Sequence, residues 1–376
     1  MNKKPKAIVV GGGIGGLTAA IALSQADVDV TVYERSREWK EIGAGIVLAS
    51  NAMKVFSQLG LAGRVAAHGV TLASGSIKTW KGEVLVAAAE ETREFINACV
   101  HRADLQRVLV EALGENNIKL GHECIGFEHH ENGIVARFAN GEGVKGDFLV
   151  GADGINSVVR ASIHGLERPR YAGYVAWRAV TLFETELASS ESWGSGKRFG
   201  IVPMGSDRVY WFATKNAPEG EVQRTEGLKQ ELLELFKDWH PPIQAIIKAT
   251  DPDVILKHDL YDRRPLKNPW GEGPVTLLGD AAHPTTPNLG QGACQAIEDA
   301  YVLAQQLRSA PDIAAALRQY EAKRIPRTAY ITNLSWRIGK IAQLQNPIAC
   351  WIRNKLLRTV PFSIQRRQLE KVLNLR

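Results

Sequence analysis

The residues with the clearest capacity to bind a ligand lie in a glycine-rich stretch near the N-terminus. The sequence GGGIGGLTAA occupies residues 11–20 and directly follows an apolar run at 7–10. Gly11, Gly13 and Gly16 match the pattern G-x-G-x-x-G, whose glycines allow a tight turn, close approach of a pyrophosphate and helix–strand packing. Glu34 ends the next apolar run, 23 residues after Gly11, where a carboxylate can bind ribose hydroxyls. This spacing predicts a dinucleotide site at a helix N-terminus.

Hydrophobic periodicity predicts the elements that must position these residues. Strands are expected at 6–10, 28–34, 118–120, 133–138, 146–150 and 274–278, and helices at 16–25, 101–113, 291–308 and from about 313. Two segments rich in aromatic and β-branched residues, 171–182 and 198–213, predict a separate antiparallel sheet.

The predicted fold class is therefore α/β, with a Rossmann-like domain, a second domain built on a mostly antiparallel sheet, and a helical C-terminus. Dinucleotide-type elements occur at both ends of the chain, so the domains are expected to be discontinuous in sequence. We assign the first domain to 1–70, 100–165 and 274–340, the second to 71–99 and 166–273, and a basic helical C-terminal segment to 341–376.

Composition excludes several classes of protein. The mean hydropathy is −0.15, and no apolar run reaches the ~18–20 residues that a membrane-spanning helix needs. The N-terminus lacks the features of a signal peptide, so we expect a cytoplasmic protein. Four scattered cysteines without a CxxC pair predict neither a disulfide framework nor a metal site.

The C-terminal segment carries the whole net charge of the chain. Residues 341–376 contain seven Lys and Arg residues against Glu370 alone, which equals the +6 of the full sequence. Large apolar residues alternate with these cations: Trp336, Ile338, Ile341, Ile348, Trp351, Ile352, Leu356 and Leu357. Such a segment can contact an anionic membrane surface, or it can pack on the body of the protein with its cations in solvent. We favour the second interpretation and expect no nucleic-acid partner.

Two further stretches identify the ligand. They are VGADGINSVVR at 150–160 and VTLLGDAAHPTTPNLGQGACQAIEDAYVLAQQL at 275–307. Together with the glycine loop, they resemble the single-component FAD-dependent aromatic hydroxylases, a family that includes zeaxanthin epoxidase and flavin-dependent urate hydroxylases. The resemblance extends to about residue 340 and implies that the dinucleotide is FAD.

The resemblance also implies roles for individual residues. The glycine loop would hold the pyrophosphate, Glu34 and Arg35 the adenosine ribose, Arg102 the phosphates, Ile125 the adenine, and Asp280 the ribityl chain. Gly43–Gly45 would lie beside the isoalloxazine, and the amides of Gly290–Ala293 would face the flavin pyrimidine ring. The complete implied FAD-binding set is Gly11, Gly13, Gly15, Gly16, Glu34, Arg35, Gly45, Val47, Arg102, Gln106, Ile125, Asp153, Asp280, Gly290, Gln291, Gly292, Ala293 and Cys294.

The chemistry that the resemblance implies is monooxygenation. NADH or NADPH would reduce FAD, O₂ would form a C4a-hydroperoxide, and one oxygen would enter an electron-rich aromatic, heteroaromatic or alkene substrate. No second G-x-G-x-x-G occurs, so NAD(P)H is expected to bind as a transient co-substrate. The alternatives are a flavin oxidoreductase without oxygen transfer and a non-catalytic flavin-binding sensor or scaffold.

Catalytic candidates are Arg198, Tyr210 and Pro287. Pro287 falls where the family has a proline near the reactive edge of the flavin, although it can equally start a helix. If a hairpin turns near 204–206, Arg198 and Tyr210 stand opposite each other and can face one anionic or hydroxylated ring. They can also be a surface cation packed on an aromatic ring.

Three neighbouring residues have weaker claims. We expect His283 to be structural and Trp177 to be a core residue, whereas Arg178 is a further pocket candidate. The expected partners are a small-molecule substrate and O₂, and the chain is expected to be a monomer or homodimer. The sequence leaves open the substrate and the choice between NADH and NADPH.

Overall fold

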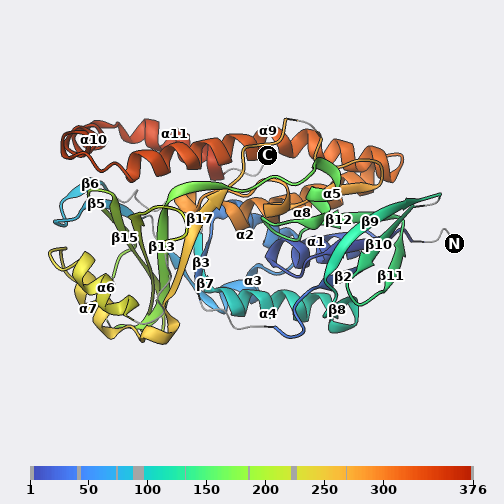
Figure 1. Cartoon of the computed structure of the whole chain (residues 1–376), viewed down its shortest axis with the longest axis horizontal. Coiled ribbons are helices and arrows are strands. Elements are labelled where there is room, and N and C mark those ends of the chain that lie inside the picture. Colours follow the sequence, from blue (N-terminus) through green and yellow to red (C-terminus); the bar gives the residue numbers. More distant parts are fainter. Residues whose placement is uncertain are drawn as a thin grey trace.

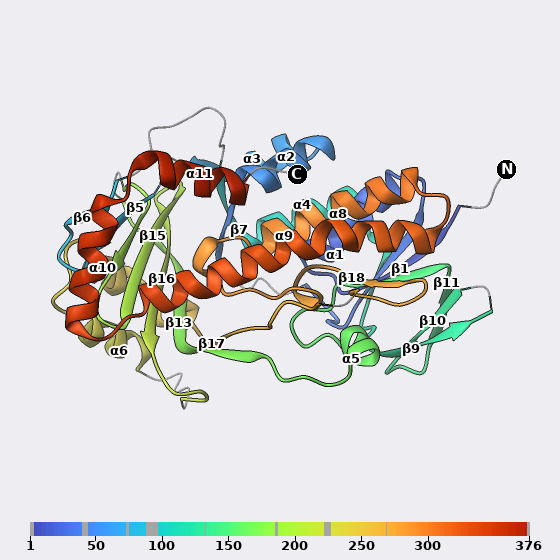
Figure 2. The same ribbon diagram turned by 90° about the horizontal axis from the view of Figure 1, so that it is seen from above.

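The molecule is an elongated body with two sheets side by side and long helices along one face (Figure 1). The computed structural model describes residues 4–39, 44–72, 75–87, 97–131, 133–184, 187–221, 227–267 and 269–373. Figure 2 shows that the longest helix, α9 (Ile313–Ala342), runs from one half of the molecule to the other.

The first half is built on a parallel sheet. Its strands are ordered β18 (Val275–Leu277), β12 (Phe148–Gly151), β1 (Lys6–Val10), β2 (Asp29–Glu34) and β8 (Ile118–Leu120), and each neighbouring pair is parallel. Ile8 and Val9 in the central strand are fully buried, as expected for a parallel sheet covered on both faces. The carboxyl ends of β1, β12 and β18 lie at the same edge, where ligands of such sheets bind.

The second half is built on a large, mostly antiparallel sheet. Its order is β17 (Leu256–Asp262), β13 (Arg170–Leu182), β16 (Arg208–Asn216), β15 (Lys197–Gly205), β14 (Ser190–Trp193), β5 (Ser76–Thr79) and β6 (Val84–Val86). One face packs on α6 (Leu228–Leu235) and α7 (Ile243–Ala249) through a core that includes Trp177, Phe199 and Trp211. The other face is turned toward the first half.

Smaller sheets and the remaining helices complete the fold. An antiparallel sheet of β3 (Gly45–Leu48), β7 (Asn97–His101) and β4 (Gly69–Leu72) lies between the two halves, and β11 (Gly143–Gly146), β10 (Gly133–Phe138) and β9 (Cys124–His130) form another. The other α-helices are α1 (Ile14–Ser24), α2 (Ser50–Gln58), α3 (Ala62–Ala66), α4 (Arg102–Leu113), α5 (Val158–His164), α8 (Gly292–Ser309), α10 (Pro347–Thr359) and α11 (Phe362–Leu373).

The predicted fold class is confirmed, and most predicted elements agree within two residues. The strand predicted at 146–150 corresponds to β12 and begins two residues later, because Gly146 ends β11 and the chain bends at Asp147. The hairpin is also shifted, because its turn is formed by Ser206 and Asp207, both with positive φ. Each half has its own hydrophobic core, and the predicted domain bounds stay a prediction. The core of the first half also includes Trp270, which was assigned to the second domain, and Val372 and Leu373 of the C-terminal segment.

The expectation that the C-terminal segment packs its apolar residues on the body is partly wrong. Trp336 does pack against a buried cluster at the start of β13. In contrast, Ile348, Trp351, Ile352 and Leu356 on α10 are 46–70% exposed. Within the described part of the chain, no helix combines the length and hydropathy that a membrane span requires.

Candidate active site

The glycine loop follows β1 and leaves open space beside one of its glycines. Gly11 has φ +109°, and a Cβ on Gly16 would collide with the Gly11 carbonyl oxygen, so the turn itself requires both glycines. Gly13 differs, because its φ is −72° and a Cβ there would meet no atom within 4 Å. Nothing in the described chain demands glycine at position 13, whereas a pyrophosphate lying against the backbone would.

Three helix N-termini converge on this space. The helices α1, α4 and α8 each begin without a side-chain cap, so their first N–H groups have no side-chain acceptor. Gln106 of α4 donates to the Gly12 carbonyl oxygen at 3.2 Å. Gly15 of α1 packs directly on Ala296 of α8. Uncapped N-termini carry partial positive charge, which favours phosphates and other anions.

Two carboxylates border the same space. Glu34 accepts hydrogen bonds from the Gly12 amide at 2.7 Å and the Ser36 amide at 2.9 Å, which holds it at the end of β2 beside the loop. Asp280 follows β18 and is solvent-accessible, yet burial raises its pKa, with His283 and Arg102 opposing the shift. An accessible side chain with a pKa raised by burial is typical of a carboxyl group at the bottom of a hollow, where surrounding protein limits hydration without covering the group.

The 150–160 stretch is joined to the 275–307 stretch by hydrogen bonds. Asp153 accepts from the Ser157 hydroxyl at 2.6 Å and from the amides of Val158 and Val159, so it fixes the start of α5. Burial raises the pKa of Asp153, and these hydrogen bonds oppose the rise. Arg160 is buried and donates to the carbonyl oxygens of Ala281 and Ala282. The motif therefore positions the Asp280 loop.

His283 is structural, as expected. Its Nε2 lies 2.6 Å from Asp299, and both side chains are buried. Burial opposes ionisation of Asp299, but His283 and Arg324 outweigh it and lower the pKa of Asp299 to about 2. With only 4% of its surface exposed and its Nε2 engaged by Asp299, the His283 ring is not accessible to a bound substrate.

The other residues of the implied FAD set divide into accessible and packed groups. Gly290 and Arg35 are exposed, and Ile125 is 60% exposed, so each leaves room for a ligand. Cys294 is buried, and burial raises the pKa of its thiol to about 12. Its sulfur accepts from the Ala49 amide, so only its backbone N–H could serve a ligand. Val47 is partly buried in the small cluster under Tyr210, and Gly43 lies outside the described residues.

The predicted pairing of Arg198 with Tyr210 is wrong. In the observed register Arg198 stands opposite Thr214, and Tyr210 stands opposite Val202. The two side chains share the face turned toward the glycine loop, but four residues separate them along the strand, on the order of 13 Å. The turn lies two residues later than predicted, because Ser206 and Asp207 adopt the left-handed region.

Arg198 is occupied by protein partners. Its Nε lies 3.0 Å from Gln343 Oε1, its Nη1 lies 3.1 Å from Glu191, and its Nη2 lies 2.9 Å from Asn288 Oδ1. The side chain is 3% exposed, and Glu191 balances its charge. Because Asn288 follows Pro287 directly, Arg198 positions the turn beside α8. Pro287 itself is exposed and is the first residue of a short 3₁₀ turn.

Arg178 has the properties that were expected of Arg198. It lies on β13 opposite Phe212, and so on the same face as Tyr210, whereas Trp177 points into the opposite core as expected. Among the described residues, Arg178 forms neither a hydrogen bond nor an ion pair. Burial raises the pKa of Tyr210 and Arg178 opposes the rise, which places the cation near the phenol. A Cβ on Gly45 would lie 2.5 Å from the Tyr210 ring, so this face contacts the segment expected beside the isoalloxazine.

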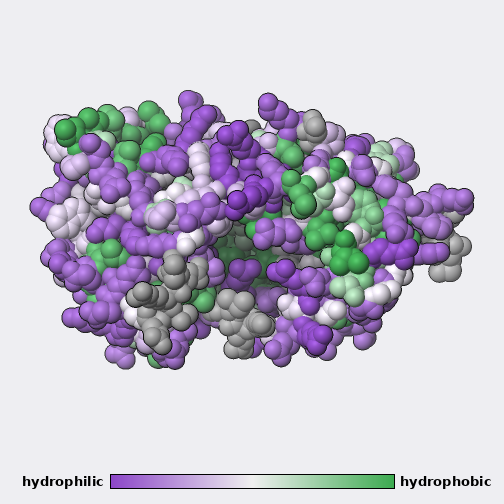
Figure 3. All heavy atoms as spheres, viewed as in Figure 1, coloured by the Kyte–Doolittle hydropathy of each residue, from purple (hydrophilic) through white to green (hydrophobic). Residues whose placement is uncertain are grey.

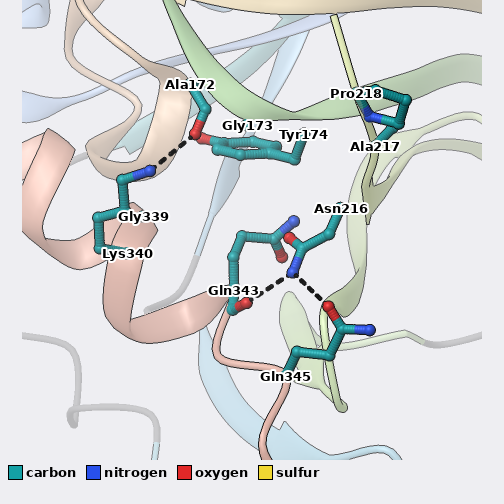
Figure 4. A pocket seen from close by; sticks show the side chains of 10 residues that line it. All are labelled: Ala172, Gly173, Tyr174, Asn216, Ala217, Pro218, Gly339, Lys340, Gln343 and Gln345. Carbon is teal, nitrogen blue, oxygen red and sulfur yellow. Dashed lines mark hydrogen bonds between the residues drawn. The ribbon is translucent and has the colours of Figure 1, made fainter. Parts of the chain in front are cut away.

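A separate hollow of about 390 Å³ adjoins this site at Tyr174. Figure 4 shows it between the start of β13 and the end of α9, with Tyr174, Lys340, Gln343 and Asn216 around it. Tyr174 donates to Asn288 and separates the hollow from the Pro287 turn. None of the glycine loop, Asp280 or Arg178 lines it. This hollow therefore lies outside the candidate site.

Sequence and structure comparisons relate this chain to known proteins. Residues 4–335 match the family model described as FAD binding domain. The chain is 44% identical to the aurachin C monooxygenase/isomerase of Stigmatella aurantiaca, over 93% of each chain. It is 37% identical to an FAD-dependent urate hydroxylase of Klebsiella pneumoniae, over 86% of each. The structure of Klebsiella pneumoniae HpxO with FAD and uric acid superposes with a TM-score of 0.90 at 31% identity, covering 98% of this chain and 96% of that one.

Proposed function

This chain belongs to the FAD-binding-domain family and is an FAD-dependent monooxygenase, and from that premise we propose that its substrate is an aromatic or heteroaromatic ring with an oxygen substituent, recognised by Arg178 and Tyr210. The single observation that carries the proposal is the half-buried, unpartnered Arg178 beside Tyr210 on the face turned toward the flavin loops. Within the described part of the chain, Arg178 has neither a hydrogen-bond partner nor an ion-pair partner.

The residues around the glycine loop fit FAD. The open space at Gly13 and the uncapped start of α1 suit the pyrophosphate, Glu34 suits the ribose, and Asp280 suits the ribityl chain. The uncapped start of α8 would face the pyrimidine ring and stabilise negative charge there. When bound, FAD supplies the redox chemistry that activates O₂ with electrons from NAD(P)H. The protein binds and orients the ring and limits water.

The substrate wall is aromatic and carries cations. Phe212 and Tyr210 have ring centroids 6.2 Å apart, and a Cβ on Gly200 would collide with the Phe212 ring. The glycine thus lets Phe212 lie flat over β15. A planar ring can stack on this wall while its oxygen accepts from Arg178. Glu191 neutralises Arg198, which leaves Arg178 as an available positive charge beside Tyr210. Arg208 lies on the same face, two residues before Tyr210 and toward Cys99, and its Nε also has no hydrogen-bond partner among the described residues.

Substitution of Arg178 by methionine tests the proposal. Phenols, purines and quinolones are screened for stimulation of NAD(P)H oxidation by the flavin-loaded protein, with O₂ uptake and hydroxylated product measured together. We expect the KM of a stimulating ring to rise ~10–100-fold in Arg178→Met, the value of a charge-assisted hydrogen bond. The flavin content of the variant should equal that of the wild type.

Arg168→Met is the matched control. Arg168 is 91% exposed and pairs only with the surface residue Glu219 among the described residues, so its loss should leave KM unchanged. An unchanged KM in Arg178→Met would refute the assignment of the pocket cation. Stimulated NAD(P)H oxidation that yields hydrogen peroxide without product, for every ring tested, would refute the substrate class.

A further inference from the structure

The outer face of α10 is an apolar stripe that the rest of the molecule leaves uncovered. Ile348, Trp351, Ile352 and Leu356 are 70%, 62%, 46% and 61% exposed. Their spacing of three and four residues puts them on one helix face. In Figure 3 hydrophobic atoms gather at the upper left corner, where Figure 1 places α10. Monomeric proteins rarely keep several large apolar side chains together in water without a partner.

The opposite face of α10 is anchored, so the stripe cannot turn inward. Asn346 caps the helix by accepting from the amides of Ile348 and Ala349. Arg353 is 5% exposed, donates to the Ala342 carbonyl oxygen at 3.1 Å and lies 5.3 Å from the Trp193 ring centroid. Arg358 pairs with Glu83 at 2.6 Å, beside β6. The helix is held with its apolar face outward.

Cations accompany the stripe. Lys355 projects from the middle of the same face, seven residues after Ile348, and its Nζ lies 5.8 Å from the Trp351 ring centroid. On α11, Arg367 and Lys371 follow the half-exposed Ile364 at helical spacing. The segment 341–376 carries seven cations against Glu370, while the rest of the chain is neutral. Apolar side chains, a tryptophan and cations on one helix are typical of helices that lie at a lipid–water interface.

We propose that α10, with the adjoining face of α11, docks the protein on an anionic lipid bilayer. Phosphate headgroups supply the negative charge that the segment lacks, and the acyl boundary covers the stripe. A second copy fits less well, because a twofold contact centred on this stripe would bring Lys355 against its own copy. The inference is independent of the substrate proposal, since no residue of α10 or α11 lines the candidate active site.

Vesicle sedimentation of the flavin-loaded, full-length protein tests the proposal. Extruded vesicles of phosphatidylcholine alone are compared with vesicles containing one part phosphatidylglycerol to three parts phosphatidylcholine. We expect binding to the anionic vesicles at ~0.1 M salt, weaker binding at ~0.5 M salt, and little binding to neutral vesicles. Leu356→Glu should weaken binding at least ~10-fold, because it removes a leucine that the bilayer would bury. Lys355→Gln should weaken it about fivefold on anionic vesicles only.

Leu182→Glu is the matched control. Leu182 is 72% exposed and lies at the end of β13 in the large sheet, beside the β15–β16 turn and outside the apolar stripe. The variant should bind vesicles like the wild type. Circular dichroism and elution volume report whether each variant is folded. No binding to anionic vesicles, or binding that Leu356→Glu leaves intact, would overturn the proposal. A wild-type dimer that Leu356→Glu dissociates would show that a second copy covers the stripe. Binding to DNA in the absence of vesicles would show that the basic residues serve a nucleic acid instead of a lipid surface.

Discussion

At the residue scale, Gly13 and Gly16 should separate ligand binding from folding. Gly13→Ala adds a methyl group to open space at an ordinary φ, so the free energy of unfolding of the flavin-free protein should change by less than about 1 kcal/mol. The same methyl group would occupy the pyrophosphate position and should weaken FAD binding at least ~10-fold. Gly16→Ala should destabilise the flavin-free fold by about 2 kcal/mol or more, because its Cβ meets the Gly11 carbonyl oxygen. Urea unfolding and flavin titration measure both effects, and equal losses of stability in the two variants would contradict this division.

The same scale shows where sequence reasoning succeeds and where it fails. Glycine spacing was sufficient to locate the loop, because Gly11 and Gly16 answer local requirements of the turn itself. The substrate cation was assigned to Arg198 because a hairpin register depends on the turn type, and two residues with positive φ moved the turn. Arg178 was named only as a further pocket candidate, although alternation favours it: its neighbour Trp177 was expected in the core, and adjacent strand residues face opposite sides. The role of Gly15 required the position of Ala296, which no local pattern reveals.

At the element scale, the uncapped N-terminus of α8 should respond to an added carboxylate in two opposite ways. Ala293 is the second residue of α8, and the first turn contains no acidic residue. Ala293→Asp should therefore stabilise the flavin-free protein by about 0.5 kcal/mol, since a carboxylate there complements the helix dipole. It should also make the midpoint potential of bound FAD more negative, because the N-terminus would no longer favour added negative charge on the flavin. Ala293→Asn is the uncharged control, and an unchanged potential in Ala293→Asp would place the flavin elsewhere.

The elements themselves were largely predictable, because β1, α1 and α8 have periodic apolar faces and turn residues at their ends. The C-terminal helices were not. Helical spacing predicted amphipathic helices, but which face of α10 is buried depends on Arg353, whose partners are carbonyl oxygens at the end of α9. Hydropathy predicts that the apolar face of an amphipathic helix is buried and its cations are exposed. In α10 Arg353 is buried and the apolar face is exposed, so hydropathy alone predicted the wrong orientation of this helix.

At the scale of the whole molecule, a buried charge cluster joins α8 to α9 and α11. Glu298 and Asp299 of α8 pair with Arg324 of α9, and Glu298 also pairs with Arg327. Arg327 in turn donates to the carbonyl oxygens of Lys371 and Val372 at the end of α11. The cluster thus links three elements: α8, which begins at the candidate FAD site; α9, which crosses both halves; and the end of α11, which belongs to the segment that we propose to contact the membrane.

This cluster should make the fold sensitive to acid over a defined range. The pKa of Asp299 is lowered to about 2 in the folded protein, since His283 and Arg324 outweigh the effect of burial. A carboxyl group with a lowered folded pKa stabilises the fold above its unfolded pKa, near 4, and this contribution is lost as the pH falls from about 4 toward 2. The expected loss from Asp299 is about 2 kcal/mol, at about 1.4 kcal/mol per pKa unit. Urea unfolding at pH values from 5 to about 2.5 measures this loss of stability.

The variant Asp299→Asn should be less stable than the wild type at pH 5 but should lose less stability on acidification. Glu128→Gln, which alters an exposed pair with Arg137, should keep the wild-type dependence. Parallel pH profiles for the wild type and Asp299→Asn would mean that acid acts on other groups.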